Sequence, residues 1–204
     1  MSLSAFLMDA LTRFVEELGF IGIFLTMAAE SCFIPIPSEI VMPFAGYVAW
    51  LNDSKGFFVG AVIASTFGNL AGAIVLYFIA SRLGRPFVEK YGKYFLLSRR
   101  ELELAEKWFL RYGAYSIFFG RMTPAVRTVI SFPAGLFEFD LRKFITLTFI
   151  GSIPWNLFLT YLGYVMGPYW SLILEYSVYV DGLVVAAVIL LIIVLALRFR
   201  ERET

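Results

Sequence analysis

Long uncharged stretches alternate with short ones along this chain. Residues 57–80 and 144–167 each run for 24 residues without a charged side chain, and residues 176–197 contain only Asp181. A helix needs about 20 apolar residues to cross the hydrocarbon core of a bilayer. The pattern therefore predicts three membrane-spanning helices.

Two further apolar regions are interrupted, and the first lies before residue 52. Residues 18–29 and 40–51 are apolar runs of 12 residues, separated by Glu-Ser-Cys-Phe-Ile-Pro-Ile-Pro-Ser-Glu. At about 1.5 Å per residue, each run reaches little more than half of the hydrocarbon thickness. Pro35 and Pro37 forbid a continuous helix through the gap. We expect a hairpin of two half-helices that enters the membrane and turns back.

The second interrupted region repeats this plan. Residues 112–120 and 128–137 are short apolar runs on either side of Arg-Met-Thr-Pro-Ala-Val-Arg. Gly46 and Gly135 end the similar sequences Pro-Phe-Ala-Gly and Phe-Pro-Ala-Gly, and an Asn-Leu pair follows each, at Asn69 and Asn156. We therefore expect an inverted repeat of two re-entrant helical hairpins, each followed by a transmembrane helix, as in secondary transporters.

The basic residues predict the topology. Eight of the 17 lysines and arginines lie in residues 81–111, and three arginines follow residue 197, which places both segments in the cytoplasm by the positive-inside rule. Within the first segment, Ser98 and Glu101 form a capping box, and we expect Gly113 to end the helix that they begin. The first hairpin then opens to the outside and the second to the cytoplasm.

These elements predict an all-α integral membrane protein with a single membrane domain over residues 1–204. Its expected parts are an interfacial amphipathic helix (1–17), repeat one (18–80), a cytoplasmic amphipathic connector (81–111), repeat two (112–167) and a C-terminal transmembrane helix (176–197).

Composition agrees with this class and excludes others. The chain is 60% hydrophobic and 18% aromatic, well above the values of soluble domains. It has no histidine and one cysteine, so imidazole metal sites, histidine bases and internal disulfides are excluded. A net charge of +1 gives no reason to expect nucleic acid as a partner. We expect no metal, no cofactor and no enzymatic activity.

Four charged residues fall within the interrupted regions: Glu30, Glu39, Arg121 and Arg127. A charge in a membrane segment costs several kcal/mol unless it is paired or hydrated, so it indicates function by default. The alternative is structural, with salt bridges that tie the two hairpins together.

The basic pair predicts a phosphate site. We expect Thr123 to cap a half-helix whose first residue is Pro124, with Arg121 and Arg127 beside its positive N-terminus. Two guanidiniums at such a terminus suit a phosphate or carboxylate ligand. Ser38 is expected to cap the second half of the first hairpin in the same manner.

The acidic pair suggests proton coupling. A low-dielectric gap favours the protonated form of a carboxylate, while nearby arginines oppose this. Glu30 or Glu39 could hold an arginine in the empty site and take up a proton when phosphate displaces it. Asn69, Asn156 and Trp155 are expected to serve either helix packing or the transport path, and Trp155 also fits an interfacial aromatic belt.

Together these motifs resemble the DedA family of bacterial membrane proteins. The resemblance covers about residues 18–168, and its most specific part is Gly-Arg-x-x-Pro-x-x-Arg at 120–127. It implies opposed re-entrant hairpins and proton-dependent translocation of undecaprenyl phosphate or other phospholipids. It also implies functional roles for Glu30, Arg121 and Arg127. Some members place the second acid farther along as an aspartate, so the role of Glu39 stays open.

The predicted function is movement of a phosphate-bearing lipid by a flippase or transporter in the bacterial inner membrane. The partners are then membrane lipids, the lipid phosphate and protons, and the sequence leaves homo-oligomer formation open. A small-ion or drug/proton antiporter is the alternative, with the arginines tuning the acids. An intramembrane phosphatase is disfavoured because the histidine nucleophile is missing.

Overall fold

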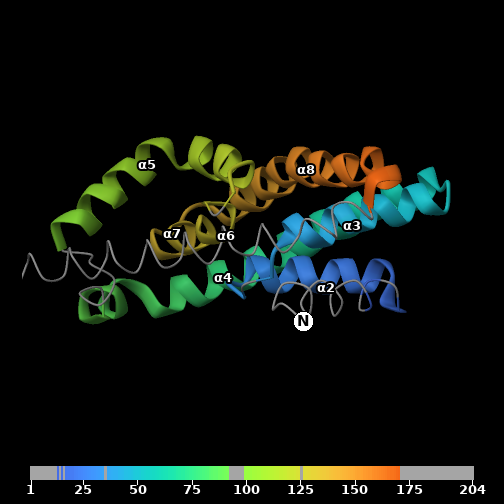
Figure 1. Ribbon diagram of the computed structural model, residues 1–204. Coiled ribbons are helices and arrows are strands. Elements are labelled where there is room, and N and C mark those ends of the chain that lie inside the picture. The colour runs from blue at the N-terminus through green and yellow to red at the C-terminus, as the bar shows by residue number, and fades with distance from the viewer. Residues whose placement is uncertain are drawn as a thin grey trace, which may run out of the picture. The chain divides into compact units, whose positions relative to one another are not determined.

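The computed structural model describes residues 13, 15, 17–34, 36–91, 99–124 and 126–170. Residues 14–167 form one compact unit. Every regular element in the described residues is a helix, which confirms the all-α prediction there (Figure 1). The predicted C-terminal span (176–197) and nearly all of the predicted interfacial helix (1–17) lie outside the described residues.

The first interrupted region forms two short helices, α2 (Phe20–Ser31) and α3 (Ser38–Leu51). α2 ends where Phe33 adopts a left-handed conformation (φ 75°), and the Ile34 N–H donates back to the Ala29 carbonyl. This is the usual geometry of a helix C-terminus, with phenylalanine where glycine is common. The predicted break around the prolines is confirmed.

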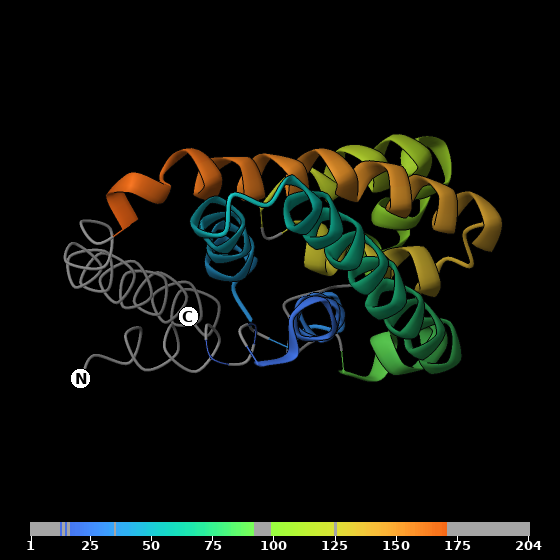
Figure 2. The same ribbon diagram turned by 90° about the vertical axis from the view of Figure 1, so that its right-hand side faces the viewer.

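Two long apolar helices form where the sequence predicts the first two membrane-spanning helices. α4 (Lys55–Tyr91) is bent at Gly84, which has non-helical backbone angles (φ 62°, ψ −178°), and α8 (Leu141–Val165) contains Pro154. The segments 55–84 and 141–165 are each long and apolar enough to cross a membrane. Figure 2 shows α8 along the top of the view and α4 running obliquely beneath it.

The second interrupted region differs from the prediction at its start. Gly113 does not end the connector helix, because α5 runs without interruption from Arg99 to Arg121. Gly113 is instead buried against the rings of Phe109 and Phe139, so its missing side chain allows close packing. After the break come two short helices, α6 (Val126–Val129) and α7 (Ser131–Leu136). A short 3₁₀ helix, η2 (Gly167–Tyr169), follows α8.

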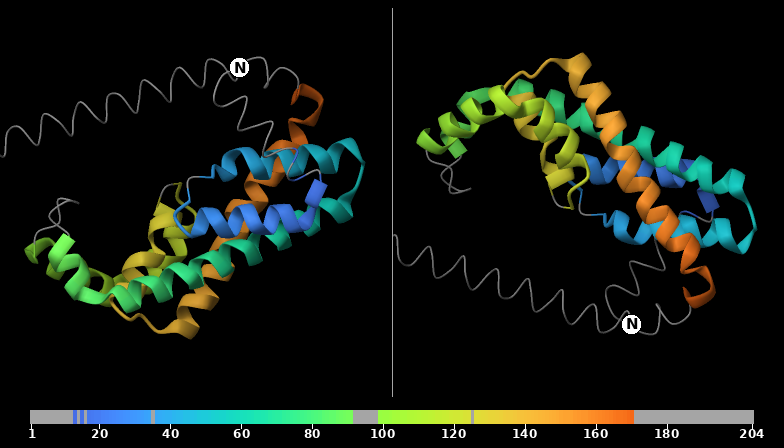
Figure 3. Two further views of the ribbon diagram at one scale, coloured as in Figure 1. Left: turned by 90° about the horizontal axis from the view of Figure 1, so that it is seen from below. Right: turned by 90° about the horizontal axis from the view of Figure 1, so that it is seen from above.

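In each half, one short helix packs on the long helix of the other half, whereas α2 and α5 pack on α4 and α8, the long helices of their own halves (Figure 3). α3 lies against α8, where the backbone of Pro43 occupies the space that a Gly163 side chain would need. α7 lies against α4, where Gly135 meets the Tyr77 carbonyl in the same way. Small residues at such crossings let membrane helices approach closely, so these glycines determine where the helices cross.

Candidate functional site

The breaks of the two interrupted regions meet at Arg127. Its guanidinium, on α6, donates hydrogen bonds to the Glu30 carboxylate near the end of α2 and to the Ser38 hydroxyl at the start of α3. Glu30 and Arg127 are each 5% exposed and Ser38 is fully buried. A buried ion pair therefore connects segments 97 residues apart in the sequence.

Arg121 lies beside this pair with fewer partners. It is the last residue of α5, is 2% exposed, and donates to the Ser131 hydroxyl on α7 at 2.5 Å. Its Nε is buried and has no hydrogen-bond partner in the described part of the chain. A buried donor without a partner costs about 1–3 kcal/mol, and more when it is charged.

The buried charges do not balance. Among the residues whose side-chain burial the structure describes, the buried charged side chains are Glu30, Arg121 and Arg127, which gives two guanidiniums and one carboxylate. An excess positive charge with an unpartnered N–H is a suitable environment for an anion.

Trp155 on α8 supplies a further donor at this centre. The guanidinium carbon of Arg127 lies 5.6 Å from the centroid of the Trp155 ring, within the range of a cation–π contact. The indole Nε1 is buried and, in the described residues, has no acceptor. Trp155 therefore packs against the Arg127 guanidinium and places a second unbonded donor beside that of Arg121.

A chain of buried hydrogen bonds crosses from α2 to α8 next to the arginines. The Ser31 hydroxyl donates to Asn69 Oδ1, Asn69 Nδ2 donates to Asn156 Oδ1, and Asn156 Nδ2 donates to the Thr66 hydroxyl, each at 3.2 Å. The Thr66 hydroxyl in turn donates to the Val62 carbonyl at 2.7 Å. These contacts join the two long helices through polar side chains.

The space between the two arginines and this series of hydrogen-bonded side chains is closed. The gaps between Ser31, Asn69, Arg121, Arg127 and Ser152 are too narrow for a water molecule. A ligand larger than water could enter here only if these side chains moved apart.

The structure brings most of the predicted site residues together, but two expected helix caps are wrong. Ser38 is the first residue of α3 and makes no capping bond; its hydroxyl accepts from Arg127. Thr123 is exposed, its hydroxyl donates to the Phe119 carbonyl at 3.0 Å, and the next helix begins only at Val126. Glu39 is exposed on the first turn of α3, whereas Glu30 is buried.

Several polar residues of the site were missed at the sequence level. They are Ser31, Thr66, Ser131 and Ser152, all buried. The available signal was weak, because a serine or threonine in a membrane helix commonly bonds to its own backbone, as Ser152 does to the Thr148 carbonyl. In the described residues no three Cys, Asp or Glu side chains gather as metal ligands would.

Long apolar helices around a buried charged centre define a helical membrane protein. Residues 36–165 match the VTT domain, so the chain belongs to the VTT domain (DedA) family, and the resemblance noted in the sequence is confirmed.

Curated relatives agree with this assignment. Undecaprenyl phosphate transporter A of Bacillus subtilis (strain 168) is 36% identical over 165 residues, which cover 81% of this chain and 80% of the relative. The protein of the same name from Staphylococcus aureus (strain NCTC 8325 / PS 47) is 27% identical, covering 93% of this chain and 94% of the relative. An alkaline phosphatase-like protein of Lactococcus lactis subsp. cremoris (strain MG1363) is 34% identical, and the match covers 81% of this chain and 78% of the relative. No solved structure matches the chain significantly.

Proposed function

We propose that this protein moves a phosphate-bearing lipid, undecaprenyl phosphate or a phospholipid, across the bacterial inner membrane. The observation that carries the proposal is the buried excess of positive charge, with two arginines against one glutamate. The names of the relatives from Bacillus subtilis and Staphylococcus aureus support a lipid phosphate as the substrate.

The phosphate would bind between the two arginines. Arg121 offers its unpartnered Nε, and Trp155 offers its indole N–H. Arg127 offers the guanidinium that now contacts Glu30 and Ser38. Charge-assisted hydrogen bonds of this kind are short and strong, and two guanidinium forks can surround a phosphate group.

Movement requires the closed centre to open to one side at a time. An inverted repeat of two re-entrant hairpins provides this in secondary transporters, because the halves exchange roles about a fixed site. Two contacts favour such a repeat here. Gly46 and Gly135, which match in sequence, each pack on the long helix of the other half. Asn69 and Asn156, which also match, bond to each other.

Glu30 is the better candidate for proton coupling. It holds Arg127 in the closed centre, so an incoming phosphate competes with it for the same guanidinium. A proton taken up by Glu30 at that moment would remove the repulsion between the two anions. Glu39 is exposed and would have a smaller effect.

Reconstitution in liposomes tests the proposal. Labelled undecaprenyl phosphate and a labelled glycerophospholipid are followed in separate arms, for the parent and for Arg121→Gln, Arg127→Gln and the exposed Lys107→Gln as control. We expect both arginine variants to lose transport and the lysine variant to retain it. Movement of neither lipid by the parent, together with cation-driven proton flux, would instead indicate an antiporter.

The same liposomes test the coupling and the enzymatic alternative. With an imposed pH gradient, Glu30→Gln should transport at a rate independent of the gradient, while Glu39→Gln should respond like the parent. Equal responses of Glu30→Gln and the parent would contradict the role of Glu30. Release of inorganic phosphate by the parent would indicate a phosphatase. Arg121→Gln would then show whether that activity depends on the arginine centre.

A further inference from the structure

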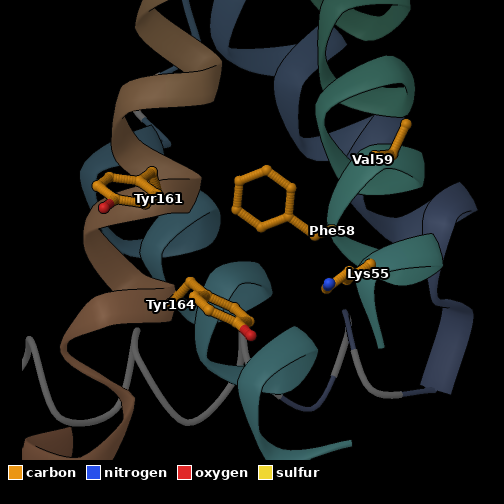
Figure 4. A pocket seen from close by; sticks show the side chains of 5 residues that line it. All are labelled: Lys55, Phe58, Val59, Tyr161 and Tyr164. Carbon is orange, nitrogen blue, oxygen red and sulfur yellow. The ribbon is translucent and has the colours of Figure 1, made fainter. Parts of the chain in front are cut away.

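A second cavity lies between the first turns of α4 and the last turns of α8 (Figure 4). It has a volume of about 320 Å³ and is lined by Lys55, Phe58, Val59, Tyr161 and Tyr164. Unlike the arginine centre, it is wide enough to hold a ligand, at the lower end of the usual range of about 300–1,000 Å³.

The walls of this cavity are apolar and aromatic. The ring of Phe58 lies in the space between the two helices and meets Tyr164 edge to face, with centroids 5.8 Å apart. Val59 and Tyr161 are 54% and 59% exposed, so the cavity is open along the outer faces of α4 and α8. These are the faces that hydrocarbon covers in a membrane protein, and a lipid chain can enter from there.

One end of the cavity is positively charged. Lys55 is the first residue of α4, and the helix dipole adds a partial positive charge at that terminus. Its ammonium and the Tyr164 hydroxyl lie at the same end of the cavity (Figure 4). The residues that line the cavity include no carboxylate.

The cavity lies far from the arginine centre along the same helices. Lys55 precedes Asn69 by 14 residues of α4, a rise of about 21 Å. Asn69 is near the middle of the candidate span 55–84, so Lys55 lies at the membrane surface. The sparse positive charge near Lys55 predicts that this surface faces outward.

We propose that this cavity binds the phosphate end and the first isoprene units of a polyprenyl phosphate at that surface, before or after its passage through the arginine centre. The small volume favours one chain over the paired chains of a glycerophospholipid. Lys55 and Tyr164 bind the phosphate, and Phe58 and Tyr161 contact the chain. The inference rests on the proposed function, because the occupant is the same class of lipid.

Photo-crosslinking of the full-length protein in detergent tests this site without requiring transport. A benzophenone amino acid replaces Tyr161, and labelling is measured with radioactive undecaprenyl phosphate, undecaprenol and phosphatidylcholine. We expect undecaprenyl phosphate to label several-fold more strongly than either uncharged or zwitterionic lipid. Lys55→Gln should lower that labelling about fivefold, since one lysine near a membrane surface contributes about 1 kcal/mol toward an anionic lipid.

Matched variants complete the test. Lys55→Arg should restore labelling, and Lys107→Gln, which removes an exposed charge from α5, should leave it unchanged. A benzophenone at Val59 repeats the measurement from the α4 wall if the first variant does not fold. Equal labelling by undecaprenol, or labelling unaffected by Lys55→Gln, would overturn the site. If labelling follows this pattern but the protein moves no lipid in liposomes, the cavity site would stand and the proposed transport function would be overturned.

Discussion

The Asn69 side chain on α4 donates a hydrogen bond of 3.2 Å to the side chain of Asn156 on α8. The two residues occupy matching places in the sequence, 23 residues after Gly46 and 21 residues after Gly135. Residues related by a two-fold repeat meet each other only near its axis, so this contact marks where that axis would pass. It also makes the asparagines important for the stability of the crossing.

Asn69→Leu should lower the free energy of unfolding by about 1 kcal/mol, in the upper part of the range for polar contacts between membrane helices. The substitution removes the Asn69 amide, which donates to Asn156 Oδ1 and accepts from the Ser31 hydroxyl. Thermal unfolding in detergent measures the change. Asn69→Leu combined with Asn156→Leu should cost less than the sum of the two single changes, and strict additivity would show that the asparagines do not interact.

Glu30→Gln should destabilise the protein by about 3–5 kcal/mol, because it leaves Arg127 buried without its carboxylate. The exposed Glu39 provides a control, and Glu39→Gln should change the stability by less than about 0.5 kcal/mol. Denaturant or thermal unfolding compares them. Equal stability of both variants would mean that the ion pair has no structural role.

Gly163→Ala should prevent α3 from packing on α8, because the added methyl group would overlap the backbone of Pro43, which cannot move like a flexible side chain. Gly56→Ala is the matched control, since its nearest neighbour is the Ser54 Oγ at 3.9 Å. Size-exclusion profiles and unfolding temperatures should show a misfolded or strongly destabilised Gly163 variant and an unchanged Gly56 variant. A well-folded Gly163→Ala protein would contradict the close crossing.

Glu138→Gly should raise the unfolding free energy by up to about 1 kcal/mol. Glu138 follows α7 with φ of 50°, a left-handed conformation that costs a side chain roughly 1–2 kcal/mol and costs glycine nothing. The greater freedom of glycine in the unfolded chain offsets part of the gain. Glu138→Ala removes the same carboxylate but keeps the strain, so it should remain at the level of the parent. A similar gain in both variants would assign the effect to charge.

Trp155→Phe should leave the fold intact and weaken lipid phosphate binding about tenfold, if the indole N–H donates to the phosphate. A hydrogen bond to a charged group contributes about 1.5–3 kcal/mol, and phenylalanine keeps a ring beside Arg127. The concentration dependence of transport measures the change. Trp50→Phe, which alters a ring packed on Gly167, should leave this dependence unchanged. An unaltered affinity in Trp155→Phe would assign the tryptophan to packing.

The long helices and the buried charges followed from the sequence because each has a large energetic signal. Uncharged runs of 24 residues have few stable alternatives to a spanning helix, and charges in apolar segments need partners. The hydrogen-bond partners of the polar residues could not be predicted from the sequence. Ser38 and Thr123 were both expected to cap helices, yet Ser38 binds Arg127 and Thr123 bonds to the preceding turn. Such choices depend on contacts between segments that are distant in the sequence.

Gly113 shows a second limit of sequence reasoning. A glycine after an amphipathic stretch often ends a helix, but it is also tolerated inside one when a neighbour needs the space. Here the rings of Phe109 and Phe139 occupy that space, and α5 continues to Arg121. As a result, the helix that begins at Arg99 continues without a break to the buried Arg121.

The closed arrangement around Arg121 and Arg127 also bears on proton movement through this centre. The gaps there are too narrow for a water molecule, so no file of water passes between these side chains. A proton that crossed at this point would have to be carried by the side chains themselves, and Glu30 is the carboxylate buried there among the residues whose burial the structure describes.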